Sequence, residues 1–343
     1  MNVIDLRSDT VSRPSSAMRE IIKDSVVGDD VLGDDPSVKL LEKKAAEIVG
    51  KQSALFVPSG TMANLIALLT HCERGDQAVV GSESHILHHE GLGAPALGGI
   101  NLGIVSNQKD GRMDVDEVNH IFKSQKSFSK LMCIENTQNR CGGTVIPKSE
   151  IAEIASIAHT AGGAVHIDGA RIFNAAYALE IDVASLVQDA DTLSFCFSKG
   201  LGAPVGSVLT GTEEFINRAR LTRRQVGGAM RQSGIIASAA LFALENNIER
   251  IGTDHVNARR LAEGLSQIPE IDVDLNLVQT NMIFISSKKI DVAVLQNDLA
   301  KHGILVSSTV PNTLRLVTHL DFSEESIDVV IEQVQKSTEN MIG

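Results

Sequence analysis

The sequence predicts an α/β protein: a mostly parallel seven-stranded sheet with helices on both faces, followed by a smaller α+β domain. Short apolar segments of strand character alternate with longer amphipathic stretches, which is typical of βαβ units and a parallel sheet. Near Leu241 this alternation ends, and a long helix expected over 233–265 leads into a shorter set of strands and helices. We therefore predict a large domain at 1–245, with an N-terminal arm, and a small C-terminal domain at 246–343.

Seven short apolar segments, rich in residues that favour extended backbone, are expected to form the sheet. In chain order they are SALFV (53–57), QAVVG (77–81), NLGIV (101–105), KLMCIE (130–135), GAVHID (163–168), TLSFCF (192–197) and GSVLT (206–210). Amphipathic stretches between them, such as 61–73 and 148–163, predict the covering helices. The turn-rich stretches SDTVSRP and GDDVLGDDP predict an arm over 1–35 that packs on a neighbouring subunit.

Charge and cysteine usage exclude several classes of protein. The net charge of −12 argues against nucleic acid or an anionic membrane as a partner, so we expect a small-molecule ligand. No apolar signal segment begins the chain and no apolar run is long enough to span a bilayer, which predicts a cytoplasmic protein. Widely spaced cysteines without a CxxC pair predict reduced thiols and no metal site; they are Cys72, Cys133, Cys141 and Cys196.

The stretch PSGT, which follows the first strand, is a candidate phosphate site. Ligands of an open parallel sheet gather at the carboxyl ends of its strands. Free backbone N–H groups at a helix N-terminus bind phosphate, a glycine such as Gly60 lets the anion approach, and Thr61 adds a hydroxyl. Alternatively, Ser59 or Thr61 serves only as the helix cap.

The stretch GAVHIDGAR places Asp168 at the carboxyl end of another strand, with Arg171 three residues later. An aspartate there could hold a proton on a ring nitrogen of a ligand, and the arginine could reach the same ligand. The alternatives are an aspartate that only stabilises the turn before Gly169 and an arginine on the solvated surface.

The stretch SFCFSKGLGAPVGS brings Lys199 to the end of a third strand. A lysine amine can attack a carbonyl and form a Schiff base, and we expect the glycines at 200, 202 and 206 to leave room for a flat ring. A lone lysine in a Gly-rich loop is otherwise a surface residue. Together, however, a phosphate cradle, an aspartate and a lysine at strand ends fit one cofactor, pyridoxal 5′-phosphate.

With these stretches in view, the sequence resembles the low-specificity L-threonine aldolases, in the β-eliminating lyase group of fold-type I pyridoxal-phosphate enzymes. The resemblance extends over nearly the whole chain. It is carried by DLRSDTVSRP (5–14), GDDVLGDDP (28–36), PSGTMAN (58–64), SHILHHEG (84–91), ENTQN (135–139), HIDGAR (166–171), SFCFSKGLGAPVGS (194–207), GGAMRQSG (227–234) and RLVTH (315–319).

The resemblance implies roles for named residues. Catalysis would depend on Lys199, which would be joined to the cofactor, on Asp168, which would pair with the ring nitrogen, and on His85, nominated for the β-hydroxyl proton. The cofactor would be held by Ser59, Gly60, Thr61, His85, Asp168, Arg171, Lys199 and, from a neighbouring chain, Arg231. The substrate would be bound by Ser8, Arg171, Arg315 and Gln138.

Two positions depart from the pattern of the family. Gln138 stands where the family usually has the histidine of ENTHN, and LGD in GDDVLGDDP replaces YGE, so that Leu32 takes the place of a tyrosine. Both positions are expected near the substrate side chain. The preference between threonine and allo-threonine therefore stays open.

The activity that the resemblance implies is retro-aldol cleavage of L-threonine or L-allo-threonine to glycine and acetaldehyde, within threonine catabolism and glycine biosynthesis. It also implies a homotetramer with active sites at dimer interfaces. The alternatives are another enzyme of the same fold, such as a serine hydroxymethyltransferase, a β-lyase or a racemase, and a non-catalytic pyridoxal-phosphate-binding protein.

Overall fold

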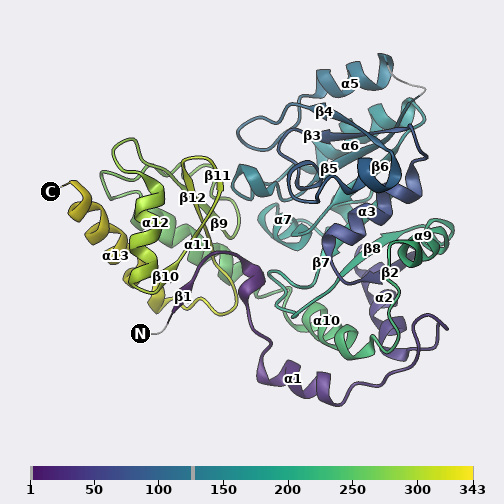
Figure 1. Cartoon of the computed structure of the whole chain (residues 1–343), viewed down its shortest axis with the longest axis horizontal. Coiled ribbons are helices and arrows are strands. Elements are labelled where there is room, and N and C mark those ends of the chain that lie inside the picture. The colour runs from purple at the N-terminus through teal and green to yellow at the C-terminus, as the bar shows by residue number, and fades with distance from the viewer. Residues whose placement is uncertain (1–2, 125–127, 343) are drawn as a thin grey trace.

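The computed structural model describes residues 3–124 and 128–342. They form a large domain and a smaller one that extends from one of its ends, and the N-terminal arm passes between the two (Figure 1). No helix within these two ranges combines the length and the apolar character that crossing a bilayer requires.

The large domain is built on a seven-stranded sheet in the order β2-β8-β7-β6-β5-β3-β4. β8 runs antiparallel to both of its neighbours, and the other neighbouring strands pair in parallel. All seven predicted strands are present, with ends shifted by no more than one residue, and the predicted mostly parallel sheet is confirmed. The strands are β2 (Ser53–Val57), β3 (Gln77–Gly81), β4 (Asn101–Val105), β5 (Ser129–Glu135), β6 (Ala164–Asp168), β7 (Thr192–Cys196) and β8 (Ser207–Gly211).

Helices cover both faces of this sheet, as predicted. The larger aliphatic core lies under α2 (Pro36–Ile48), α5 (Val115–Ser124), α6 (Lys148–Thr160), α7 (Ile172–Ala178), α8 (Val183–Leu186) and α10 (Gly234–Asn246). Two smaller cores lie under α3 (Gly60–His71), α9 (Glu213–Gln225), the short α4 (His85–His88) and the π-helix η2 (Ala94–Gly98). Local signals set the helix starts: Asp35 accepts hydrogen bonds from two backbone N–H groups of α2, whose first residue is Pro36.

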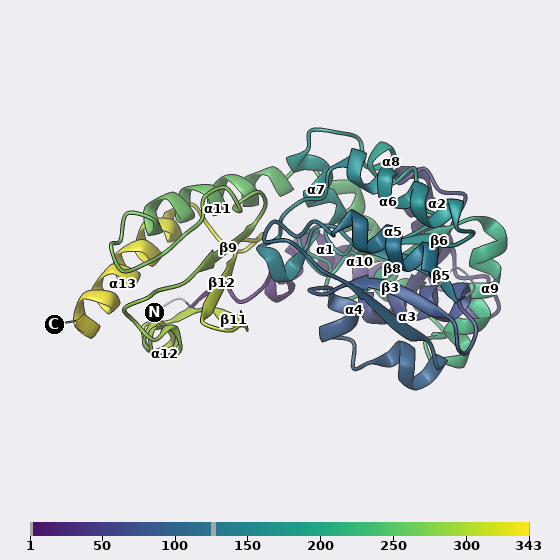
Figure 2. The same ribbon diagram turned by 90° about the horizontal axis from the view of Figure 1, so that it is seen from above.

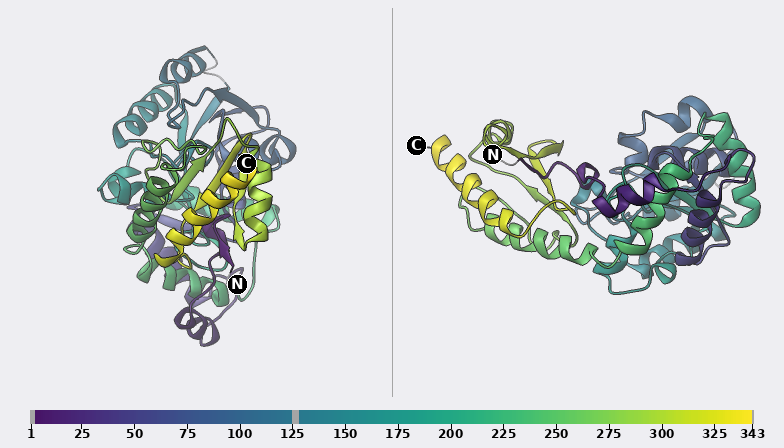
Figure 3. Two further views of the ribbon diagram at one scale, coloured as in Figure 1. Left: turned by 90° about the vertical axis from the view of Figure 1, so that its left-hand side faces the viewer. Right: turned by 90° about the horizontal axis from the view of Figure 1, so that it is seen from below.

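The small domain has a three-stranded antiparallel sheet in the order β11-β12-β9, with α11 and α13 on one side of it (Figures 2 and 3). Its elements are α11 (Ile251–Leu265), β9 (Met282–Ile285), α12 (Val292–Lys301), β10 (Ile304–Leu305), β11 (Ser307–Val310), β12 (Thr313–Val317) and α13 (Glu325–Ile342). The prediction of one helix over 233–265 is wrong, because α10 ends at Asn246. The next residue, Asn247, is a weak helix former, and its side chain donates a hydrogen bond to the backbone carbonyl of Leu201, outside the helix, at 2.6 Å.

The arm joins both domains. Its first part, β1 (Ile4–Asp5), pairs in parallel with β10, and Leu6 is buried in the core of the small domain. The turn η1 (Asp9–Val11) follows, and α1 (Ser16–Lys23) then packs on α10 of the large domain. A segment that is first in the sequence therefore completes the packing of the last third of the chain.

Candidate active site

The carboxyl ends of β2, β3, β5, β6 and β7 lie at one edge of the large sheet, because these strands share one direction. The residues that follow them are the predicted site segments. Pro58 to Thr61 follow β2, His85 comes after β3, Asp168 ends β6 and Lys199 comes after β7. The topology therefore brings together segments that are up to 140 residues apart in the sequence, as the positions 59 and 199 show.

At the β2–α3 turn, the alternative role of Ser59 as a helix cap is confirmed, because its hydroxyl accepts a hydrogen bond from the Met62 N–H at 3.2 Å. The backbone N–H groups of Gly60 and Thr61, in the first turn, have no partner within the helix. Ser59 and Thr61 are exposed. The turn thus presents N–H donors and a hydroxyl at a helix N-terminus, which is the donor set that a phosphate group requires.

Gly60 is also required by packing. A Cβ atom on Gly60 would lie 2.9 Å from the Sγ atom of Cys196, which ends β7. The glycine therefore keeps the N-terminus of α3 tight against the strand that leads to Lys199. Sequence reasoning gave only the approach of an anion as the reason for this glycine.

Asp168 is buried, and both of its carboxylate oxygens accept hydrogen bonds. Oδ1 accepts from the Ala170 N–H at 3.2 Å, and Oδ2 accepts from the Asn64 side-chain amide at 2.8 Å. Two donors hold the carboxylate in a fixed direction. This arrangement suits a group that must keep an ionised oxygen next to a protonated ring nitrogen.

Asn64 is a site residue that sequence reasoning did not single out. Its amide nitrogen donates to Asp168 and to Glu90 Oε1, both at 2.8 Å, while its oxygen accepts from the Ser194 hydroxyl at 2.7 Å and lies 3.1 Å from His166 Nε2. All the hydrogen-bonding capacity of this buried amide is used. The only signal in the sequence was a polar residue on the apolar face of α3.

His85 begins the short helix α4, and its Nδ1 lies 2.8 Å from Glu90 Oε1. Burial opposes the charged imidazolium, but the hydrogen bond to Glu90 and the nearby Asp168 carboxylate outweigh it and raise the pKa of His85. No described residue forms a hydrogen bond with Nε2. His85 therefore has one nitrogen fixed by a carboxylate and the other available to a ligand.

Replacing Glu90 with glutamine is expected to lower the pKa of His85, because the carboxylate that stabilises the imidazolium is removed. A raised pKa keeps the proton on His85 to higher pH, so in Glu90→Gln the neutral imidazole appears at lower pH. NMR titration of the histidine ring protons measures this shift, and Glu249→Gln, an exposed position, is the control. An unchanged His85 titration would show that Glu90 does not set its charge.

Glu135, at the end of β5, is a second residue that the sequence did not reveal. Its carboxylate accepts from the backbone N–H of His85 at 2.6 Å and from that of Asn139 at 2.9 Å. Burial, and the Asp168 carboxylate on the neighbouring strand, raise the pKa of Glu135 to about 7. Glu135 thereby joins the loop that carries His85 to the turn that carries Asn139.

Within the described ranges, one group of side chains could hold a metal ion: His85, Glu90 and Asp168, whose ligand atoms lie within 4.8 Å of one another. Each of these atoms already has a protein partner, because Asn64 donates to both carboxylates and His85 contacts Glu90. These three side chains are therefore joined, with Asn64, in one network of hydrogen bonds.

Lys199 is half-buried at the carboxyl end of the β7 segment. None of the described residues forms an ion pair or hydrogen bond with its amine. The amine is nevertheless close enough to contribute to lowering the pKa of Asp9, and to oppose in part the rise in the pKa of His85. An amine without a carboxylate partner, at the point where the phosphate turn and Asp168 converge, is available for covalent chemistry.

Two of the glycines around Lys199 also have backbone roles, and the expectation that the glycines leave room for a ring stays a prediction. Gly202 and Gly206 adopt φ values of +76° and +114°, which side chains rarely tolerate. A Cβ atom on Gly206 would also lie 2.7 Å from the ring of Phe56. These glycines allow the loop to turn back from β7 into β8, and so they present Lys199 at the edge of the sheet.

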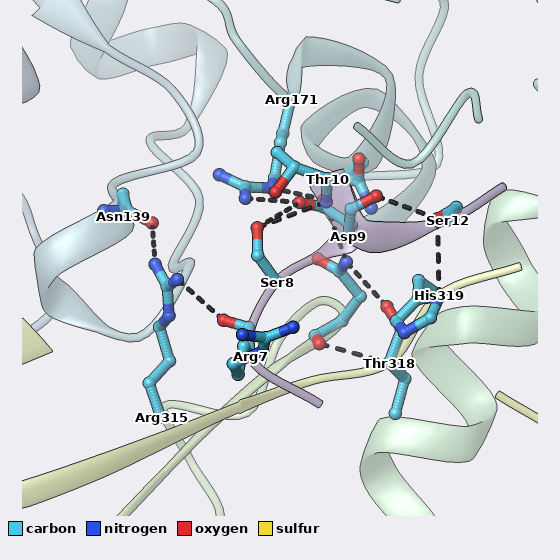
Figure 4. A network of polar contacts seen from close by, with 12 residues as sticks. Arg7, Ser8, Asp9, Thr10, Ser12, Asn139, Arg171, Arg315, Thr318 and His319 are labelled. Atoms are coloured by element: carbon cyan, nitrogen blue, oxygen red, sulfur yellow. Dashed lines mark hydrogen bonds and ion pairs between the residues drawn. The ribbon is translucent and has the colours of Figure 1, made fainter. Parts of the chain in front are cut away.

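Arg171 forms a buried two-bond ion pair with Asp9 of the arm (Figure 4). Its Nε donates to Asp9 Oδ2 and its Nη2 to Asp9 Oδ1, both at 2.6 Å. This pairing occupies two of the three nitrogens of Arg171 and leaves Nη1 for a ligand. Asp9, the third residue that sequence reasoning missed, is fully buried, and Arg171 strongly lowers its pKa despite burial.

Arg315, in β12, is buried without any carboxylate partner among the described residues. Its Nη1 donates to Asn139 Oδ1 at 2.8 Å and its Nη2 to the Arg7 carbonyl at 2.9 Å (Figure 4). Its Nε is buried and has no hydrogen-bond partner. Burial and the neighbouring Arg171 lower the pKa of Arg315 to about 10. A buried guanidinium that forms no ion pair with any described residue is a strong candidate for an anion receptor.

The other predicted site residues lie in varied surroundings. Ser8 adjoins Asp9, and its hydroxyl accepts from the Thr10 N–H at 3.2 Å. The Gln138 amide donates to the Glu83 carbonyl, in the loop after β3, and accepts from the Arg140 N–H within its own turn. Leu32 is exposed on the loop before α2, and Arg231 is exposed and paired with Asp29 on that same loop. Among residues 3–124 and 128–342, no hydrogen bond or ion pair joins Leu32 or Arg231 to His85, Asp168 or Lys199.

Comparison with known proteins agrees with this geometry. The family model of the beta-eliminating lyases matches residues 5–288. The low-specificity L-threonine aldolase of Escherichia coli K12 is 42% identical over 95% of this chain and 96% of its own length. Low-specificity L-threonine aldolase 1 of Arabidopsis thaliana is 40% identical over 98% of this chain and 97% of its own length. The solved structure of Leishmania major threonine aldolase superposes with a TM-score of 0.82 at 20% identity, over 97% of this chain and 99% of that one.

Proposed function

The chain belongs to the beta-eliminating lyase family, and from this premise we infer that it cleaves the Cα–Cβ bond of L-threonine and L-allo-threonine to give glycine and acetaldehyde. It is a carbon–carbon lyase of the low-specificity L-threonine aldolase type. The full-length similarity to threonine aldolases carries this function. The structural observation that supports it is Arg315, a buried cation that forms no ion pair with a described carboxylate and whose Nε has no hydrogen-bond partner, so it could receive the carboxylate of an amino acid.

The residues at the sheet edge fit pyridoxal 5′-phosphate. The donors at Ser59–Thr61 would hold its phosphate, Asp168 would keep a proton on its ring nitrogen, and His85 would lie against its ring. Lys199 offers the amine that its aldehyde requires, and Nη1 of Arg171 is free to reach its hydroxyl. When bound, this cofactor supplies an electron sink for the electron pair released as the Cα–Cβ bond breaks.

The residues of the chain orient the substrate and move one proton. Arg315, with Ser8, holds the substrate carboxylate and so fixes which bond of Cα breaks. Because Glu90 occupies Nδ1 of His85, the proton of the β-hydroxyl passes to Nε2. Loss of that proton turns the Cβ–O bond into the carbonyl of acetaldehyde as the Cα–Cβ bond breaks. Nε2 then gives up its proton and Cα takes one up, so the cleavage involves no net change in protons when glycine is released.

The test of this function is to offer each of the four threonine stereoisomers, with and without added cofactor. We expect glycine and acetaldehyde in equal amounts from L-threonine and L-allo-threonine, and none from the D isomers. A requirement for folate, or release of a keto acid with ammonia, would contradict the assignment in favour of another enzyme of this fold.

We further propose a homotetramer with active sites at dimer interfaces. Leu32 and Leu221, 74% and 67% exposed, border a cavity of about 390 Å³ that three arginines also line, namely Arg220, Arg223 and Arg224. Exposed leucines beside such a cavity are typical of a surface that another chain covers. The exposed Arg231 is then available to the cofactor phosphate of a neighbouring chain. A cytoplasmic location is also proposed, which four free, buried cysteines support.

Replacing Leu221 with aspartate is expected to lower the molecular mass of the assembly, because a charge cannot be buried unpaired in an apolar interface. Light scattering after gel filtration measures the mass. Val294→Asp, at an exposed valine of the small domain, is the matched control and should leave the mass unchanged. A wild-type protein that is monomeric, or a Leu221→Asp protein of unaltered mass, would count against this interface.

A further inference from the structure

A chain of buried polar side chains lies between the large sheet and helix α3. Side chains alternate between the two faces of a strand, so His166 and Asp168 of β6 share the face that α3 covers. The register of β6 and β7 sets Thr192 beside His166 and Ser194 beside Asp168. Asn64 of α3 contacts this group from the helix, and all five residues are buried. Of the five, His166 has no part in the mechanism given above.

The hydrogen bonds of the Asn64 amide determine which way it faces. Its nitrogen lies 2.8 Å from an oxygen of Asp168 and 2.8 Å from one of Glu90, and carboxylate oxygens accept hydrogen bonds. The amide oxygen therefore faces the other way, where the Ser194 hydroxyl donates to it at 2.7 Å. His166 Nε2 lies 3.1 Å from the same oxygen. Because an amide oxygen only accepts, Nε2 of His166 must carry a hydrogen.

The other nitrogen of His166 continues the chain. The Thr192 hydroxyl lies 3.0 Å from His166 Nδ1 and 3.0 Å from His71 Nε2. Burial lowers the pKa of His166 to about 4 and that of His71 to about 3, so both rings are neutral at neutral pH. A neutral ring with its hydrogen on Nε2 has an Nδ1 that accepts, here from Thr192, whose oxygen accepts in turn from His71. All the donors therefore point in one direction, from His71 toward Asp168.

His166 opposes rotation of the Asn64 amide. An amide turned end for end would set its oxygen against two carboxylates and its N–H groups against the Nε2–H of His166. Ser194 could adapt to the turned amide, because a hydroxyl both donates and accepts. His166 could not adapt without moving its hydrogen to Nδ1, where Thr192 already donates. The imidazole is thus the donor that distinguishes the two orientations, and only one of them gives Asp168 an N–H partner.

We propose that His166 is a positioning residue: by donating from Nε2 to Asn64, it fixes the amide that directs Asp168 at the ring nitrogen of the cofactor. The inference rests on the proposed function, because it concerns how the ring of pyridoxal 5′-phosphate would be held. His166 acts only through Asn64, since its own ring is fully buried beneath α3. It extends the site one residue deeper into the sheet than the groups that meet the cofactor.

The test compares pyridoxal 5′-phosphate with its deaza analogue, in which a carbon atom replaces the ring nitrogen while the aldehyde, hydroxyl and phosphate are kept. Titration of the cofactor-free full chain gives the dissociation constant of each. The wild type is expected to prefer the nitrogen ring about 10- to 100-fold, which is the worth of one charge-assisted hydrogen bond. His166→Leu should reduce this preference about 5- to 10-fold, because Asn64 loses its donor. His166→Gln should keep most of it, because the glutamine amide reaches as far as Nε2 and also donates.

The ratio of the two dissociation constants separates positioning from a merely structural role. A structural role would weaken both cofactors equally, so a folded His166→Leu protein with the wild-type ratio would overturn the proposal. His255→Leu is the matched control, because the His255 ring also contacts an asparagine, Asn174, at 3.0 Å, but outside this chain of hydrogen bonds. It should leave the ratio unchanged, and an equal loss in this control would also count against the proposal.

Failure of the proposed function would look different. A wild type that binds neither cofactor would overturn that function. A wild type that binds both equally would remove Asp168 from the ring nitrogen, and this inference with it.

A second measurement does not depend on whether His166→Leu folds. Nitrogen-15 NMR of the histidine-labelled holoenzyme distinguishes the two neutral forms of an imidazole ring, and the signals missing from His166→Gln identify those of His166. We expect hydrogen on Nε2 and none on Nδ1. The opposite form would overturn the proposal, because Nε2 would then be unable to donate to Asn64.

Discussion

Replacing Lys199 with alanine is expected to leave a folded protein that has lost essentially all release of acetaldehyde from L-threonine. The loss should be about 10³-fold or more, as for other groups that act covalently, because the amine of Lys199 is the nucleophile that we propose for the cofactor aldehyde. The folded state should persist, since no described residue depends on that amine for a hydrogen bond or an ion pair. Acetaldehyde release and the visible absorbance of bound cofactor measure the two effects.

Lys148→Ala is the matched control, because Lys148 is also half-buried and its amine donates to Ser185 Oγ at 2.8 Å outside the site. This control should retain both activity and absorbance. Partial recovery of Lys199→Ala by an added small amine would support a covalent role. A Lys199→Ala protein that cleaves threonine at the wild-type rate would remove Lys199 from the mechanism.

Replacing Arg315 with glutamine is expected to raise KM for L-threonine about 10- to 100-fold, because the substrate loses a charge-assisted pair of hydrogen bonds. Losing an interaction that stabilises the ground state and the transition state equally raises KM alone, whereas misalignment of the Cα–Cβ bond would also lower kcat. Steady-state kinetics separate the two effects. Arg315→Lys keeps the positive charge but lacks the planar guanidinium, so its KM for L-threonine should lie between that of Arg315→Gln and that of the wild type.

The control for Arg315 is Arg260→Gln, at an exposed arginine of α11 that pairs with Glu324. It should leave KM unchanged. If Arg315→Gln also leaves KM unchanged, the unpaired guanidinium has another purpose and the substrate carboxylate is bound elsewhere.

The elements that the sequence predicts well are those whose signal is local. Each strand of the large sheet is a short apolar run. Polar residues end or follow these strands, as Asp168 ends β6 and Lys199 follows β7, at the point where ligands of this sheet gather. The break after Asn246 was missed because helical periodicity continues on both sides of it. Asn247, which follows α10, donates to the carbonyl of Leu201, 46 residues earlier, and a contact so distant is contained in no local stretch of sequence.

The parts of the site that sequence reasoning missed are those that act across the sheet. Asn64 joins Glu90 to Asp168, and Asp9 holds Arg171 from 162 residues away. Neither residue has a chemical type that indicates such a role, because an asparagine in a helix and an aspartate in a turn are ordinary. Their importance follows from burial and from which charges they face, and these depend on the tertiary structure.

The placement of the arm has a consequence for the order in which the protein folds. Ile4 donates its backbone N–H to the Gly303 carbonyl, and the Val317 N–H donates to the Leu6 carbonyl, so the arm completes its packing with residues some 300 positions later in the sequence. Contacts so distant along the chain form late, because a very long loop must close first. We therefore expect the arm to dock on the small domain in a late step of folding. Pulse-labelled hydrogen exchange during refolding would test this, and early protection of the Ile4 and Leu6 amides would refute it.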